Sequence, residues 1–264
     1  MLKSLYTTAT GMKAQQTMVD MIANNIANVN TAGFKKSQAS FEDLLYVTTQ
    51  SPGLAQGAGG VAAPIGLQIG SGTKLNGTTK VYSPGTLEIT DRNLDVSIDG
   101  DGFFAVTLPD GNIGYTRDGG LQLNADGKLV TGQGNILQPE TTLPSDLLEI
   151  NIDPQGRITG RTASNPDTST LFGQLTIHRF LNPSGLLNVG GNVVRQTEAS
   201  GAPVTATPGL SGLGQLKQGF IERSNVQIVN ELVNLIVAQR AYEVNSRAIQ
   251  ASDQMLSTAT NIVR

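Results

Sequence analysis

Cysteine and tryptophan are absent from this chain of 264 residues, and histidine occurs once, as His178. Without cysteine the chain has no disulfide, no thiolate metal site and no cysteine nucleophile. A lone histidine cannot build a multi-histidine metal site. A serine–histidine–aspartate triad would depend on His178, and no Gly-x-Ser-x-Gly turn supplies its serine. We therefore predict no catalytic residue, no metal, no cofactor and no enzyme activity.

Concentrated positive charge and long apolar runs are also missing. The formal net charge is −3, and lysine and arginine are scattered, so no basic patch predicts nucleic-acid binding. The longest apolar runs, such as residues 235–238, are too short to cross a bilayer, so we predict a protein that is not membrane-inserted. The first residues also lack the apolar core and cleavage site of a conventional secretion signal.

Acidic and glycine-rich motifs do not predict a ligand either. Asp95, Ser97 and Asp99 match the first half of an EF-hand loop, but Val106 stands where the loop needs a glutamate. The Gly127-Lys128 pair lacks the upstream glycine and the following serine or threonine of a phosphate-binding loop. Turn formation explains these residues better.

Glycine, by contrast, is abundant, with 31 residues, and the hydrophobic share is only 38%. From about residue 73 to 205, short alternating apolar runs are separated by turn dipeptides, which predicts one all-β domain. Three dipeptides between such runs predict β-hairpins: Asp110-Gly111, Asp126-Gly127 and Gln155-Gly156. The same alternation predicts that His178 lies in a strand and points away from the face of Ile177.

Both ends of the chain have a seven-residue rhythm that predicts long coiled-coil helices. The strong N-terminal stripe is Leu5, Met12, Val19 and Ile26, and the weak one is Leu2, Ala9, Gln16 and Ala23. The strong C-terminal stripe is Ile228, Leu235, Tyr242, Ile249, Leu256 and Val263, and the weak one is Leu232, Gln239, Ser246, Asp253 and Thr260. A narrow stripe on an isolated helix is marginal in water, so these stripes pair with each other or with other copies.

The residues between helix and β domain allow two interpretations. Residues 46–72 are rich in glycine, proline, alanine and serine, which is typical of a flexible linker. Their apolar residues, which include Leu54, Val61 and Ile65, are more numerous than a linker needs. An ordered arm lying on a neighbouring molecule is therefore also possible.

Three separate motifs resemble one known family, the rod and hook proteins of the bacterial flagellar axis. The stretch TGMKAQQTMVDMIANNIANVNTAGFKK (10–36) resembles the family's N-terminal signature, and ELVNLIVAQRAYEVNSRAIQASDQML (231–256) its C-terminal one. DGDGFFAV (99–106) and GNILQP (134–139) are similar to its shared β-domain sequence. The inserted arm, opened by Asp43-Leu44-Leu45-Tyr46 and closed by residues 66–70, is similar to that of distal rod subunits.

This resemblance implies a structural subunit of the distal rod, the drive shaft that transmits torque from motor to hook. Such a subunit polymerises helically around an export channel. Its expected partners are further copies of itself, the proximal rod proteins, the hook protein, and the P and L ring proteins where an outer membrane exists. The resemblance further implies export by the flagellar type III apparatus without a cleaved signal peptide, and a location in the basal body within the periplasmic space.

We predict an α+β fold in which the two terminal helices pair as a coiled coil beside a central all-β domain and an extended arm. The predicted parts are the N-terminal helix of an inner, tube-lining domain (1–33), a connecting region (34–72) with the arm (46–70), the β domain (73–215) and the C-terminal segment with its long helix (216–264).

The asparagines near the end of the first helix lead to a hypothesis about assembly. Asparagine is a mediocre helix former, but its amide donates and accepts hydrogen bonds, so it can join several helix ends. We predict this role for Asn24, Asn25, Asn28 and Asn30, with Asn245 and Ser246 as partners. Gly33 is expected to end the helix in a left-handed cap, and Ser224 with Gln227 to start the second helix as a capping box.

The predicted self-assembly residues are these asparagines with the strong stripes and two polar neighbours: Leu5, Met12, Val19, Ile26, Ile228, Leu235, Gln239, Arg240, Tyr242, Asn245, Ile249 and Leu256. The arm is predicted to stiffen the assembly through Tyr46, Pro52, Gly53, Leu67 and Ile69. Two alternatives remain open. One is a hook or proximal rod subunit; the other is a monomeric β-domain binding module whose two helices close into a self-sufficient hairpin.

Overall fold

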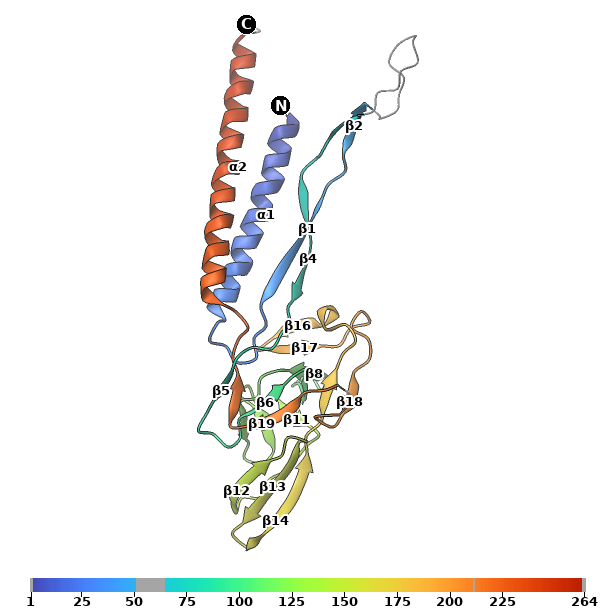
Figure 1. Cartoon of the computed structure of the whole chain (residues 1–264), viewed down its shortest axis with the longest axis vertical. Coiled ribbons are helices and arrows are strands. Elements are labelled where there is room, and N and C mark those ends of the chain that lie inside the picture. The colour runs from blue at the N-terminus through green and yellow to red at the C-terminus, as the bar shows by residue number, and fades with distance from the viewer. Residues whose placement is uncertain (1, 51–64, 211, 263–264) are drawn as a thin grey trace. The chain divides into compact units, whose positions relative to one another are not determined.

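A computed structural model describes residues 2–50, 65–210 and 212–262, and these residues form two compact units (Figure 1). The helical unit comprises residues 1–26, 37–79 and 228–264, and the β unit comprises residues 27–36 and 80–227. The predicted α+β composition, with terminal helices and a central β-rich region, is confirmed. The four-part domain division stays a prediction. The units differ from it because strand β4 pairs within the helical unit and residues 215–222 supply strands to the β unit.

Helix α1 spans Leu2–Ala27 and helix α2 spans Ile228–Ile262. Both predicted helix boundaries were wrong. Helix α1 stops well before Gly33, because Thr31 closes a turn onto Asn28 through its backbone N–H and its hydroxyl, both at 3.2 Å. Helix α2 starts after the predicted cap at Ser224, whose hydroxyl oxygen instead accepts the N–H of Val226 at 3.3 Å in the preceding turn.

The two helices lie side by side and antiparallel within the helical unit (Figure 1). The hydroxyl oxygens of Ser4 and Ser252 are 3.5 Å apart, and the Asn25 amide donates to Glu231 at 3.3 Å. Between these pairs, Gly11 faces Asn245 so closely that a Cβ at position 11 would lie 3.1 Å from the amide nitrogen. From one pair to the next, the residue number on α1 increases by seven or fourteen and the number on α2 decreases by the same amount. The three pairs therefore share one antiparallel register.

The contacts that define this register are made by small or polar residues. On α2 the seam contains Glu231, Ala238 and Ser252, all buried. The weak C-terminal stripe was predicted one position away and is mostly exposed, at Leu232, Gln239, Asp253 and Thr260. On α1 the weak stripe is likewise exposed at Ala9, Gln16 and Ala23. Both weak stripes therefore lie off the seam.

Apart from the helices, the described residues of the helical unit form two short two-stranded sheets. Strand β1 (Ser37–Asp43) pairs with β4 (Thr73–Lys80), and β2 (Val47–Gln50) pairs antiparallel with β3 (Leu67–Ile69). In the segments that link these two sheets, the N–H of Leu44 donates to the carbonyl oxygen of Gly72 at 2.9 Å. The described part of the predicted arm is therefore paired strand.

The β unit is built around a seven-stranded antiparallel sheet of order β16-β17-β8-β7-β11-β10-β9. Its strands are β7 (Phe104–Thr107), β8 (Ile113–Thr116), β9 (Leu121–Leu123), β10 (Leu129–Thr131), β11 (Ile136–Gln138), β16 (Leu187–Gly190) and β17 (Val193–Arg195). The predicted hairpins at Asp110-Gly111 and Asp126-Gly127 are confirmed as the β7–β8 and β9–β10 turns. Both glycines have positive φ, which only glycine adopts without strain.

Smaller antiparallel sheets complete the unit. Strands β12 (Leu147–Ile152), β13 (Arg157–Thr162) and β14 (Asn165–Gln174) form one, and its β12–β13 turn is the predicted hairpin at Gln155-Gly156. The three remaining pairs are β15 (Ile177–Arg179) with β18 (Val204–Ala206), β19 (Gln215–Gln218) with β6 (Val96–Asp99), and β20 (Phe220–Glu222) with β5 (Leu87–Ile89). A single 3₁₀ turn, η1 (Pro183–Gly185), is the one helical element among the unit's described residues.

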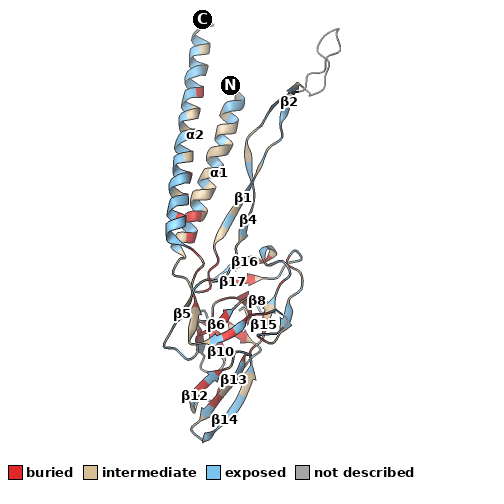
Figure 2. Cartoon of the chain, in the orientation of Figure 1, coloured by how far each residue is buried: buried red, intermediate tan, exposed pale blue. Residues whose placement is uncertain are grey.

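Buried residues concentrate in the strands of the β unit, whereas the helices show mainly exposed and intermediate residues (Figure 2). The main core contains aliphatic residues and Phe104, and it includes Ile98, Leu129, Ile158 and Leu216. A second cluster is aromatic and packs edge to face: Tyr82 on Phe103, and Phe180 on both Phe103 and Tyr115. The β unit therefore has a complete core of its own, as a domain requires.

His178 lies on β15, partly buried, while its neighbour Ile177 is fully buried in the core, as the alternation predicted. Its Nδ1 is 2.8 Å from the hydroxyl of Thr205, and its ring packs edge-on against Tyr115. Burial lowers the pKa of His178 below its ordinary value of 6.5. The unfolded chain therefore takes up this proton at higher pH than the folded chain.

From this we predict that His178 weakens the β unit in mild acid. Its stabilising contribution is complete above pH 6.5 and declines as pH falls through that value towards the folded pKa. Urea unfolding at about pH 7.5 and about pH 5.5 measures the decline, which should be smaller in His178→Gln. An unchanged pH dependence in the variant would contradict the assignment.

Candidate functional site

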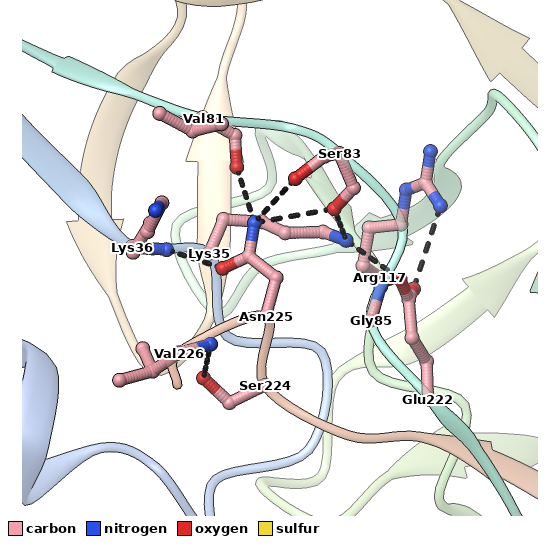
Figure 3. A network of polar contacts seen from close by, with 10 residues as sticks. All are labelled: Lys35, Lys36, Val81, Ser83, Gly85, Arg117, Glu222, Ser224, Asn225 and Val226. Atoms are coloured by element: carbon pink, nitrogen blue, oxygen red, sulfur yellow. Dashed lines mark hydrogen bonds and ion pairs between the residues drawn. The ribbon is translucent and has the colours of Figure 1, made fainter. Parts of the chain in front are cut away.

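Three stretches of the β unit continue directly into the helical unit: residues 27–36, the segment that starts at Lys80, and the segment that ends at Gln227. The side chain of Asn225 connects all three within the β unit (Figure 3). Its oxygen accepts the N–H of Lys36 at 2.8 Å. Its nitrogen donates to the carbonyl oxygens of Val81 at 2.8 Å and Ser83 at 3.2 Å, and to the Ser83 hydroxyl at 3.1 Å.

A buried charge cluster joins the same stretches. The ammonium of Lys35 lies 2.6 Å from a Glu222 carboxylate oxygen, and the other oxygen lies 3.4 Å from the Arg117 guanidinium. The side chains of Lys35, Glu222 and Arg117 are only 2%, 1% and 3% exposed. Lys35 also donates to the Ser83 carbonyl at 2.8 Å, and the N–H of Gly85 donates to Glu222 at 2.8 Å. We call Lys35, Lys36, Val81, Ser83, Glu222 and Asn225 the junction clamp.

The cluster holds two cations and one anion away from water. Burial lowers the pKa of Lys35, while the adjacent Glu222 carboxylate opposes this shift. The Arg117 guanidinium lies over the Phe103 ring at 5.4 Å, a favourable cation–π distance, but its Nε has no hydrogen-bond partner. Burial raises the pKa of nearby Tyr82 to about 12, against the smaller effect of Arg117. Glu222 is therefore the anion that makes both buried cations tolerable.

Gly33 anchors the first of these stretches to the others. Its φ is +67°, its N–H donates to the Glu222 carbonyl at 2.8 Å, and a Cβ at this position would lie 2.7 Å from the carbonyl carbon of Arg117. The left-handed conformation was predicted, but its role as the cap of α1 was wrong, because the helix has already ended at Ala27. Glycine is required here for tight packing in the turn that follows the helix.

We predict that Gly33→Ala destabilises the β unit by more than about 2 kcal/mol, because a left-handed alanine is strained and its methyl group meets backbone atoms. Gly132→Ala is the matched control, since position 132 lies in the same unit with no atom near a new methyl group. Denaturant unfolding of both variants measures the difference. Equal losses in the two would contradict the packing role.

Glu222→Gln is expected to destabilise the β unit by about 3 to 5 kcal/mol, because it leaves Lys35 and Arg117 buried without a counter-charge. Lys35→Met in the same chain should recover part of this loss by removing one cation. The control is Glu88→Gln, since Glu88 is an exposed partner of Arg223 and its loss should change little. A Glu222→Gln variant as stable as Glu88→Gln would exclude the cluster as a structural element.

In the helical unit, one predicted asparagine has the predicted chemistry. Asn25 is buried and pairs both ways with the backbone of Ser37: it donates to the carbonyl at 3.0 Å and accepts the N–H at 2.9 Å. It also donates to Glu231. Asn24 and Asn30 are exposed, and half-buried Asn28 forms the turn with Thr31. The role of all four in assembly stays a prediction.

The other predicted assembly residues lie along the helices. Half-buried are Leu5, Met12, Val19, Ile26, Leu235, Asn245, Ser246, Ile249 and Leu256, and exposed are Ile228, Gln239, Arg240 and Tyr242. Val19 and Tyr242 line one hollow of about 420 Å³ with Gln16, Gln239 and Glu243. Gln227 is exposed before α2, and Tyr46, Leu67 and Ile69 are exposed on or beside the arm strands. Pro52 and Gly53 lie outside the described residues.

Sequence reasoning missed Arg117, Glu222 and Asn225. Lys35 and Glu222 are 187 positions apart, and Arg117 and Glu222 are 105 apart, so no local spacing connects them. Among the described residues, no three acidic or histidine side chains gather as a metal site. None of the described helices combines the length and apolarity that a membrane crossing needs.

Family models match three parts of the chain. Residues 5–35 match the flagella basal body rod protein model, residues 97–160 the flagellar hook protein FlgE/F/G D1 domain, and residues 217–262 the flagellar basal body rod FlgEFG protein C-terminal model. The flagellar basal-body rod protein FlgG of Buchnera aphidicola subsp. Schizaphis graminum is 46% identical over 99% of this chain and 100% of its own length. The chain belongs to the flagellar basal-body rod and hook family.

Within this family, rod proteins are the better match. FlgG of Borreliella burgdorferi is 44% identical and covers all of both chains. The hook protein FlgE of Helicobacter mustelae is 29% identical, and this chain spans only 65% of it. The predicted function, a structural subunit of the flagellar distal rod located in the basal body, is therefore confirmed.

Proposed function

We propose that this rod subunit polymerises helically with copies of itself around an export channel and transmits torque from the motor to the hook. In this proposal, residues 1–33 and 216–264 belong to the inner, tube-lining domain, where the helices pack as a coiled coil. The β domain (73–215) then lies outside them. The observation that carries the proposal is the way α2 distributes its apolar residues.

Helix α2 turns several of its large aliphatic side chains away from α1. Val229, Val233, Ile236 and Val244 are 73%, 54%, 57% and 63% exposed, although all are β-branched and apolar. At 100° per residue they cluster on the side of the helix roughly opposite the seam residues Glu231 and Ala238. We call these four residues the outer face of α2. Exposed apolar residues gathered on one side of a helix mark an interaction site.

This arrangement also separates the proposal from the binding-module alternative. A hairpin that closes a monomer would bury its aliphatic residues between the helices and expose its polar ones. Here Leu235, Ile249 and Leu256 are only half-buried and the four aliphatic residues of the outer face are exposed, so none of the described residues buries that face. A second copy of the chain supplies a covering surface, because every copy presents the same face in a repeating, non-closing contact.

The arm fits the same proposal. Leu45, Tyr46, Ile65, Leu67 and Ile69 are exposed on or beside the paired strands β2 and β3. A two-stranded sheet on its own is marginally stable, and apolar side chains on it are covered only by another surface. We propose that the arm lies on a neighbouring subunit and stiffens the rod.

The remaining partners follow from membership of the family. We propose contacts with the proximal rod proteins, the hook protein and, where an outer membrane exists, the P and L ring proteins. Export by the flagellar type III apparatus would bring the chain to the periplasmic space without a cleaved signal peptide. Like its relatives, which are named as rod proteins, the chain would act as a structural part and not as an enzyme.

Ile236→Lys tests the outer face. A charge there should abolish polymerisation, because burying an unpaired lysine is costly, while the β unit keeps its parent stability. Gln254→Lys is the control, since Gln254 is an exposed polar residue of the same helix. Sedimentation and electron microscopy of purified protein count the polymers, and swimming tests the rod in cells. Normal polymers and normal swimming from Ile236→Lys would refute the proposal.

A further inference from the structure

The residues of the junction clamp lie close to the points where the chain passes between the β unit and the helical unit. Lys35 and Lys36 immediately precede the helical unit's residue 37, Val81 and Ser83 follow its residue 79, and Glu222 and Asn225 precede its residue 228. Apart from the short link at residues 26 and 27, every covalent path out of the β unit starts within a few residues of the clamp.

We propose that the junction clamp shares force among these paths, so that a load arriving through one of them is carried by all of them. This inference rests on the proposed torque-transmitting function. It assigns to named side chains the step at which force enters the β unit.

Backbone pairing alone would share the load weakly, because the bonds from Gly33 N–H to the Glu222 carbonyl and from Val81 N–H to the Lys36 carbonyl are single and separate. Strand β20, which leads to α2, pairs with β5 through only three residue pairs, Phe220 with Ile89, Ile221 with Glu88 and Glu222 with Leu87. A pull on Gln227 would open such a short antiparallel pair one bond at a time from its end. The Asn225 side chain changes this, because its bonds to Lys36, Val81 and Ser83 must break together before the pull reaches β20.

The charge cluster resists the same pull after the Asn225 bonds have broken. Once Asn225 yields, the load meets Glu222, which is held by Lys35, Arg117 and the N–H of Gly85. Opening this cluster exposes buried charges in poor geometry before water can solvate them, which makes the opening cooperative. The three stretches do not pair as strands of one sheet, so a side chain has to connect them. The Asn225 amide can do so because it both donates and accepts hydrogen bonds.

A single-molecule pulling experiment on the whole chain tests the proposal. The chain has no cysteine, so Ser257→Cys on α2 and Thr168→Cys on β14 give unique attachment points. Helix α2 acts only as a tether, so the result does not depend on its folding in the isolated chain. We expect an opening of the junction at high force, followed by unfolding of the sheets.

Three variants are compared with the parent chain by the force at which the junction opens. Asn225→Ala should lose the high-force opening, and Asn225→Asp should keep part of it, because a carboxylate can still accept from Lys36 but cannot donate to Val81 and Ser83. Asn188→Ala, which removes an exposed asparagine from β16, should behave as the parent. The later unfolding force should be equal in all four proteins. Junction opening at the parent force in Asn225→Ala would overturn the proposal.

Hydrogen exchange on the unsubstituted chain provides a second measurement that holds even if a variant does not fold. The N–H groups of Lys36 and Gly85 should exchange through one common opening, because their acceptors, the side chains of Asn225 and Glu222, both belong to the clamp. Independent exchange of the two would overturn the clamp. Both experiments use isolated chains, so their failure would leave polymerisation untouched, and a failure of the Ile236→Lys test would leave the clamp standing.

Discussion

The geometry of the junction clamp depends on the ion pairs that the buried Glu222 carboxylate forms with Lys35 and Arg117. Two cations, Lys35 and Arg117, reach it from distant parts of the sequence, and none of the three meets water. A buried ion pair adds little net stability, but removal of one partner is costly, so the pair specifies a single arrangement. Because Gly33 and Gly85 also donate backbone N–H groups to Glu222, correct placement of one glutamate positions four segments of the β unit.

The two units solve the burial problem in opposite ways. The β unit encloses its aliphatic and aromatic residues in two cores, as an independently folded domain does. Apart from Ile22, the helical unit buries mainly small or polar residues of its helices, such as Ala14, Asn25, Ala238 and Ser252, and it leaves most valines of α2 exposed. In the proposed assembly, the exposed aliphatic residues of the helical unit would contact neighbouring subunits. The helices would then gain stability from these contacts, while the β unit has its own core.

Features that depend on a few neighbouring residues were predicted from the sequence, and features that depend on distant residues were not. The hairpins at Asp110-Gly111 and Asp126-Gly127 were predictable because turn chemistry is decided within a few residues. The helices were predictable from periodicity, but α1 ends early because Thr31 bonds to Asn28, a competition that periodicity does not contain. The seam was misplaced by one position, since Glu231 is buried and pairs with Asn25 while Leu232 is exposed. The junction clamp was out of reach, since its members meet only after the β unit has folded.

The seam of the helix pair has a further property, which is near-translational symmetry. A slip by one heptad, about 10 Å along the axis, would again set small or polar residues against each other, for instance Gly11 against Ser252. At Gly11, shape therefore hardly distinguishes the two alignments. The slipped one would place Asn25 against Ala238 and leave the buried Glu231 without its amide donor. This polar pair thus favours the observed axial alignment, as a single buried asparagine does in coiled coils.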